Sequence, residues 1–111
     1  MQQVVIKFGG TSVSTRATWN NIAAITQKHL NTGVQPVIVC SALTQISNKL
    51  EKAIEAALLD EHHSLFNDIQ SSHLNLAEQL EVNHQLIAND LHQLQQWLTG
   101  ISLLKQAPAK T

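Results

Sequence analysis

The sequence predicts an α/β fold in which a strand–helix–strand unit with parallel strands is followed by a helical hairpin. Two short apolar runs, residues 2–8 and 35–42, have the length and the β-branched content of buried strands. Between them, residues 15–31 carry apolar side chains at steps of three and four, which is typical of one helix face. From Ser47 onward the chain shows helical spacing alone. The sheet is therefore expected in the first half of the chain and the helices in the second.

The first half has the pattern of a crossover unit. Its first strand contains the consecutive residues "VVI" at positions 4–6 rather than an alternating pattern, which favours a parallel strand covered on both faces. The helix is expected to end near Gly33, because glycine is the usual residue just beyond a helix C-terminus. A strand joined to the next strand of its sheet through a helix lies parallel to it.

The second half divides into three helical segments, residues 47–63, 62–80 and 83–105, before a tail at 106–111 that is expected to be a loop. The third segment has a heptad-like seam made of Ile87, Leu91, Leu94, Leu98 and Ile101. This seam is too short for a free-standing coiled coil. The third segment is therefore expected to form an antiparallel hairpin with the second.

The predicted fold is incomplete. Two parallel strands are too few for a stable α/β sheet, which is expected to have at least three strands and helices on both faces. We therefore expect residues 1–111 to be the N-terminal part of one domain, with the strand–helix–strand unit in 1–48 and the helical segment in 49–111. Its uncovered strand edges and seam predict self-association into a homo-oligomer.

Composition excludes several classes of partner. Seven Lys and Arg residues face eight Asp and Glu residues, and no basic block indicates a nucleic-acid partner. No apolar stretch is long enough to span a membrane, and the N-terminus lacks the pattern of a secretory signal. The single cysteine excludes an internal disulfide and fits a reducing compartment. These observations favour a cytoplasmic location.

The loop after the first strand has the composition of an anion site. Open α/β sheets bind ligands at the carboxyl ends of their strands, and Gly9 and Gly10 fall at such an end. Glycine permits positive φ and lets backbone N–H groups converge on a ligand. Thr11 and Ser12 add hydroxyls, Lys7 adds a positive charge, and the following helix directs its positive end to the same place. The pattern predicts phosphate binding; the alternative is a tight turn beside a solvated lysine.

The loop after the second strand is polar as well. Its sequence "CSALTQISN" contains Ser41, Thr44 and Ser47, and parallel strands direct their carboxyl ends to one edge of the sheet. The second loop is therefore expected beside the first. Simple helix capping by serine is the alternative explanation. Neither loop matches the G-x-x-x-x-G-K-[ST] or the G-x-G-x-x-G pattern.

The block "KFGGTS", residues 7–12, resembles the opening signature of aspartate kinases, in the amino acid kinase family. The resemblance continues through the helix and the second strand to the loop with Ser41 and Ser47, over about the first fifty residues. The family usually has glycine near Gln45 and threonine at position 47. The segment "CSALTQISNKLE" most resembles the aspartate kinases that are fused to diaminopimelate decarboxylase.

The resemblance implies transfer of the γ-phosphoryl group of ATP, with Mg²⁺, to the side-chain carboxylate of L-aspartate, in the biosynthesis of lysine, threonine and methionine. Lys7 would be catalytic by neutralising charge on the transferring group. The nucleotide-binding residues would be Lys7, Phe8, Gly9, Gly10 and Ser12, and the substrate-binding residues Ser41 and Ser47. The family's acidic substrate residue and its adenine pocket lie further along the chain than these 111 residues. The chain alone is therefore expected to be inactive.

Two other functions fit the sequence. One is an amino acid kinase that acts on a different acceptor. The other is a non-catalytic interaction module in which the seam at 87–101 binds a partner helix. No metal site is expected, because His62 and His63 are adjacent and so do not share a helix face, and the sequence offers no cysteine partners at ligand spacing.

Overall fold

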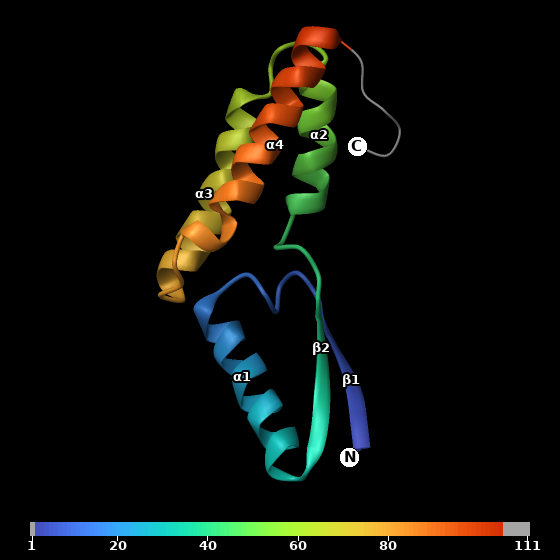
Figure 1. The fold of residues 1–111 in the computed structure, drawn as a ribbon, viewed down its shortest axis with the longest axis vertical. Helices are drawn as coiled ribbons and strands as arrows, with labels where there is room; N and C mark the ends of the chain where they lie inside the picture. Colours follow the sequence, from blue (N-terminus) through green and yellow to red (C-terminus); the bar gives the residue numbers. More distant parts are fainter. Residues whose placement is uncertain (1, 106–111) are drawn as a thin grey trace. The chain divides into compact units, whose positions relative to one another are not determined.

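The computed structural model describes residues 2–105, in which a strand–helix–strand unit is followed by three helices (Figure 1). The chain divides into two compact units, of which the first ends at Gln45 and the second begins at Ile46. The loop expected at 106–111 lies outside the described residues. This mixture of a parallel sheet and helices confirms the predicted α/β class.

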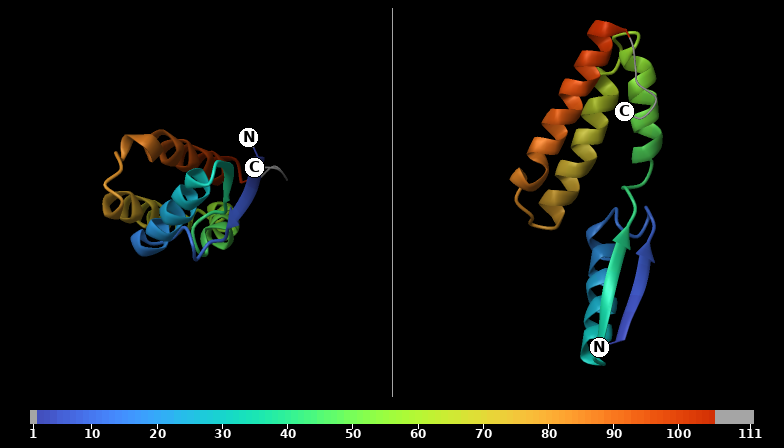
Figure 2. Two further views of the ribbon diagram at one scale, coloured as in Figure 1. Left: turned by 90° about the horizontal axis from the view of Figure 1, so that it is seen from below. Right: turned by 45° about the vertical axis from the view of Figure 1, so that its right-hand side comes forward.

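The first unit is a parallel pair of strands joined by a helix. Strand β1 (Gln2–Phe8) pairs with β2 (Val34–Cys40) without any offset, from Gln2 opposite Val34 to Phe8 opposite Cys40. Helix α1 (Arg16–Asn31) connects them and packs against β2. Both strands point the same way, which the right-hand view of Figure 2 shows most clearly. Their carboxyl ends therefore share one edge of the unit.

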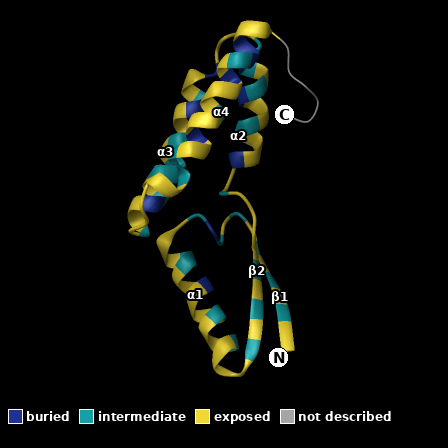
Figure 3. Cartoon of the chain, in the orientation of Figure 1, coloured by how far each residue is buried: buried dark blue, intermediate teal, exposed yellow. Residues whose placement is uncertain are grey.

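The sheet has one covered face and one bare face. Along β1 the half-buried residues Val4 and Ile6 alternate with Val5, which is 65% exposed. On β2 the side chains of Val37 and Val39 are 42% and 43% exposed. Figure 3 shows exposed and intermediate residues alternating along the strands. The expectation of cover on both faces is wrong for the described residues, in which α1 is the element that packs on the sheet. The apolar run "VVI" is typical of a strand that is buried on both faces, but here the face that carries Val5 is exposed to solvent.

Local interactions fix both ends of α1. Thr15 is the N-cap: its Oγ1 accepts from the backbone N–H of Thr18 at 3.2 Å, and the Thr18 hydroxyl accepts from the Thr15 N–H at 3.3 Å. This reciprocal pair is a capping box. Beyond the other end, Gly33 has φ 77°, which confirms the expected glycine at the helix terminus. The indole N–H of Trp19 donates to the carbonyl of buried Val13 at 2.7 Å and so ties the preceding loop to the helix.

The second unit contains three helices: α2 (Ile46–Ala57), α3 (His63–Gln79) and α4 (Gln85–Leu104). Helix α2 packs against both others, and α3 and α4 run in opposite directions as the predicted hairpin (Figures 1 and 2). The buried apolar side chains are Ile46, Ala53, Ala57, Phe66, Ile69, Ala77, Leu91, Leu98 and Ile101. Within residues 2–105, no helix combines the length and apolar character that a membrane crossing requires.

The predicted seam of α4 faces the interior of the second unit. Leu91, Leu98 and Ile101 are buried, and Ile87 and Leu94 are half-buried. The seam therefore packs against the neighbouring helices of its own unit, which leaves little of it for a partner helix.

Candidate functional site

The candidate site lies at the carboxyl ends of β1 and β2, where two loops leave the sheet next to each other. The parallel pairing extends one step beyond the strands, because the N–H of Ser41 donates to the carbonyl of Phe8 at 3.0 Å. The first loop therefore begins at Gly9, directly beside the start of the second. This confirms that the two polar loops share one edge, at least as far as Gln45.

The first loop presents unused backbone donors. A turn closes between the N–H of Ser12 and the carbonyl of Gly9, which are 3.0 Å apart. In the described part of the chain, the N–H groups of Gly9, Gly10 and Thr11 donate to no acceptor. Consecutive free N–H groups at the end of a strand are suited to the oxygens of a bound anion. The loop thus has the donors that phosphate needs.

Gly10 lets the two loops approach closely. A Cβ atom at this position would lie 3.3 Å from the carbonyl oxygen of Ala42 and 3.4 Å from the Cα of Thr44. A Cβ at Gly9 would meet nothing within 4 Å. Among the described glycines, Gly33 alone has a positive φ, so neither Gly9 nor Gly10 uses the left-handed backbone that glycine permits. Glycine is needed at position 10 because a side chain there would crowd the backbone of the second loop.

Ser14 joins the two loops. Its hydroxyl donates to the carbonyl of Gly10, accepts from the N–H of Thr44 at 3.0 Å and lies 3.0 Å from the Thr44 hydroxyl. Sequence reasoning missed this role, because a serine just before a helix has the pattern of a helix cap. Here Thr15 caps the helix, which leaves the Ser14 hydroxyl available for the second loop.

Lys7 supplies a positive charge in a unit that has no negative side chains. It is exposed, and it lies opposite Val39 on the strand pair. Residues 2–45 include the cations Lys7, Arg16 and Lys28 but no Asp or Glu. No carboxylate of the first unit can therefore neutralise the Lys7 ammonium or repel an anion from the loop.

Phe8 and Ser12 complete the predicted nucleotide site in different ways. The half-buried side chain of Phe8 alternates with exposed Lys7, and its carbonyl holds the second loop. Phe8 therefore acts through packing and its main chain. Ser12 is half-buried, and its hydroxyl has no hydrogen bond among residues 2–105. That hydroxyl is available to a ligand at the loop.

The two residues of the predicted substrate site fall in different units. Ser41 is exposed at the start of the second loop, and its hydroxyl donates to the carbonyl of Ala42 at 2.8 Å. Ser47 is exposed in the first turn of α2, in the second unit. Between them, Gln45 adopts φ 67°, a left-handed backbone that favours glycine. The structure brings Ser41 to the edge with the first loop, whereas the substrate role of Ser47 stays a prediction.

Comparison with known proteins agrees with this arrangement. Residues 2–104 match the amino acid kinase family. The chain is 34% identical over 112 residues to "Aspartokinase 2, chloroplastic" of Arabidopsis thaliana, covering 96% of this chain and 20% of that protein. It is 32% identical over 108 residues to "Aspartokinase 3, chloroplastic" of the same plant, covering 92% of this chain and 19% of the relative.

A bacterial relative matches as well. The chain is 28% identical over 114 residues to "Bifunctional aspartokinase/homoserine dehydrogenase" of Buchnera aphidicola, covering 94% of this chain and 14% of that protein. The chain thus spans a fifth or less of the length of these relatives. Because the family match runs through both loops and all the described helices, the chain belongs to the amino acid kinase family.

Proposed function

We propose that this chain supplies the phosphate-binding loop of an aspartate kinase, which transfers the γ-phosphoryl group of ATP to the side-chain carboxylate of L-aspartate. The observation that carries the proposal is the set of three consecutive free N–H groups, from Gly9 to Thr11, at the end of β1. The absence of acidic residues from positions 2–45 and the aspartokinase names of the relatives support it.

Each residue of the loop has a role in this proposal. Phosphoryl transfer needs mainly positioning and electrostatic stabilisation. Lys7 neutralises the charge that develops on the transferring group, and the N–H groups of Gly9 and Gly10 bind its oxygens. The Ser12 hydroxyl adds a donor, and Phe8 holds the loop through its main chain. On the second loop, Ser41 lines the reaction centre, while Ser47 binds the aspartate.

ATP fits these residues better than a divalent ion does. Free N–H groups and an ammonium bind phosphate oxygens, whereas Mg²⁺ prefers carboxylate oxygens and water. Residues 2–45 contain no carboxylate side chain, so the two loops offer no such ligand to Mg²⁺. The proposal therefore assigns no magnesium ligand and no step through the ion to these residues.

The proposal concerns the full-length enzyme. The chain covers 20% or less of its relatives, and its two loops hold neither an acidic substrate residue nor an adenine pocket. We therefore expect no kinase activity from these 111 residues alone. The proposed partners are ATP and L-aspartate, in the pathway to lysine, threonine and methionine, with a homo-oligomer in the cytoplasm. A fused diaminopimelate decarboxylase stays a prediction.

The test is the substitution Lys7→Ala in the full-length protein. Formation of acyl phosphate is measured as a function of ATP and aspartate, with Lys28→Ala on the exposed surface of α1 as the matched control. Loss of one preorganised electrostatic contact lowers kcat on the order of a hundredfold. An unchanged rate in Lys7→Ala would remove the proposed role of this lysine, as would an equal loss in the control.

The two alternative functions, a kinase with another acceptor and a helical interaction module, require different features of the structure. An amino acid kinase with another acceptor keeps the same phosphate loop, and a panel of carboxylate substrates in the same assay separates it from an aspartate kinase. The interaction module needs an exposed seam on α4. Because Leu91, Leu98 and Ile101 are buried within the second unit, the structure gives that alternative no support.

A further inference from the structure

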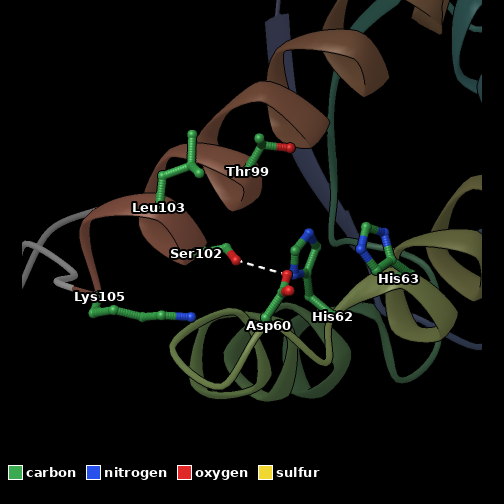
Figure 4. A pocket seen from close by; sticks show the side chains of 7 residues that line it. All are labelled: Asp60, His62, His63, Thr99, Ser102, Leu103 and Lys105. Atoms are coloured by element: carbon green, nitrogen blue, oxygen red, sulfur yellow. Dashed lines mark hydrogen bonds between the residues drawn. The ribbon is translucent and has the colours of Figure 1, made fainter.

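Three potential metal ligands meet at one end of the second unit. Asp60 lies in the turn after α2, His62 is the N-cap of α3, and His63 is its first residue. One ligand atom from each of them lies within 4.8 Å of the other two (Figure 4). The two imidazole rings have centroids 4.3 Å apart and planes inclined by 33°.

The turn geometry explains why adjacent histidines can converge. Inside a regular helix, adjacent residues point in different directions. In the structure α3 begins at His63 and His62 is its N-cap, and the two imidazole rings lie next to each other at this helix boundary. Asp60 has φ 57°, which reverses the chain and brings its carboxylate back toward the two rings. Sequence spacing contains no signal for this arrangement.

His62 is buried and lacks a partner. The residue is 3% exposed, and its Nδ1 is buried with no hydrogen bond in the described part of the chain. A buried polar nitrogen without a partner is destabilising and rare in native structures. The ring lines a cavity of about 340 Å³ together with Asp60, His63, Thr99, Ser102, Leu103 and Lys105. A ligand in this cavity would give the unsatisfied nitrogen a function.

The surroundings of Asp60 suit a cation. The Ser102 hydroxyl donates to Asp60 Oδ1 at 2.7 Å, which orients the carboxylate from α4. Helices α2 and α4 both end here, and the C-terminus of a helix carries a partial negative charge. The Lys105 ammonium extends toward Asp60, and its positive charge opposes the binding of a cation (Figure 4).

We propose that Asp60, His62 and His63 form a binding site for a divalent transition-metal ion of the zinc type. Two imidazoles and one carboxylate are a ligand set that Zn²⁺ accepts, with water in the fourth position. Tetrahedral bonds of about 2.1 Å place ligand atoms roughly 3.4 Å apart, so the side chains must draw closer than they are here. The exposed side chains of Asp60 and His63 can make this adjustment.

The test is calorimetric titration of the whole chain with Zn²⁺ at neutral pH. We expect one ion per chain and affinity losses of at least about tenfold in Asp60→Asn and in His63→Ala. Both residues are exposed, and asparagine tolerates the left-handed backbone, so both variants keep the fold. His92→Ala, which removes an exposed histidine of α4, is the matched control and should bind as the unmodified chain does. Lys105→Gln should bind more tightly.

The possible outcomes are decisive. Loss of affinity in both ligand variants, with His92→Ala unchanged, supports the site. The proposal is overturned if Zn²⁺ does not bind, if either ligand variant binds as the unmodified chain does, or if the control loses as much affinity. Visible absorption of Co²⁺ bound at the same stoichiometry provides a second measurement, since a tetrahedral nitrogen–oxygen site gives stronger bands than hexahydrated Co²⁺. Its disappearance in His63→Ala is the expected result, and its persistence counts against the site.

Discussion

Gly10 lies where the backbones of the two loops at the carboxyl edge of the sheet approach each other closely. A methyl group there meets the carbonyl of Ala42, and a backbone oxygen cannot rotate away as a flexible side chain can. Gly9, one position earlier, has open space around it. The two glycines therefore make different contributions: Gly10 allows the loops to pack, and Gly9 leaves its surroundings open to a ligand.

Substitution by alanine separates these contributions. We expect Gly10→Ala to lower the free energy of unfolding by about 1 kcal/mol or more, because the added carbon overpacks the loop contact. Gly9→Ala, the matched control, should change it by less than about 0.5 kcal/mol, as a substitution in open space does. Urea denaturation of both variants measures the difference. Equal free energies of unfolding for Gly10→Ala and Gly9→Ala would show that the loops accommodate the added methyl group without loss of stability.

Gln45 has a backbone conformation that favours glycine, although it carries a long side chain. Its φ is 67°, and the family resemblance places glycine near this position. A residue with a Cβ in this region carries strain of about 1–2 kcal/mol, part of which is offset because glycine loses more chain entropy on folding. The departure from the family pattern therefore falls at a strained position.

Two variants at position 45 isolate this strain. Gln45→Gly and Gln45→Ala both remove the glutamine side chain and its interactions, but only the first relieves the backbone. We expect the glycine variant to be more stable than the alanine variant by about 0.5–1 kcal/mol. Thermal and urea unfolding of the pair provide the measurement. An alanine variant as stable as the glycine variant would mean that position 45 is not strained.

At the scale of the helices, the predicted bounds of α3 and α4 lie within two residues of the observed ones, whereas α2 ends at Ala57, well before the predicted residue 63. Strand β1 has the predicted bounds, and Gly33 marks the end of α1 as expected. The second half offers no such mark, because α2, α3 and α4 are followed by the left-handed residues Asp60, Glu81 and Lys105. The position of the glycine-containing loop after β1 was predictable from "KFGGTS". The Ser14 bridge and the Asp60–His63 cluster were not, because both depend on how the chain turns in three dimensions.

The end of α3 gives a direct test of these termini. The N–H of Val82 donates to the carbonyl of Ala77 at 2.9 Å around Glu81, whose φ is 56°. This is the closure that glycine usually allows. Glu81→Gly should therefore raise the free energy of unfolding by about 0.5–1 kcal/mol, whereas Glu78→Gly, inside the helix, should lower it by about 1 kcal/mol. Two changes of the same sign in thermal unfolding would contradict the assignment of Glu81 as the strained residue.

For the whole molecule, the two units differ in charge and in how completely they are covered. All eight acidic residues lie in the second unit, which also buries its apolar seam. The first unit is basic and leaves the valines of one sheet face exposed, and its two strands each have a free edge in the described part of the chain. An apolar face beside unpaired strand edges favours association with another sheet. A second copy of the chain offers the same face and the same edges.

Self-association through this sheet is the last prediction. Val37 lies in the middle of β2, opposite Val5 on the bare face, so Val37→Lys places a charge at the centre of the proposed contact. We expect sedimentation or light scattering to show dimers or larger species of the unmodified chain at high concentration, and mainly monomers of this variant. Leu86→Lys changes a residue of the second unit that is 70% exposed and should leave the association unchanged. A monomeric unmodified chain would contradict the prediction. If Val37→Lys and Leu86→Lys reduced the association equally, the sheet face would not be the contact surface.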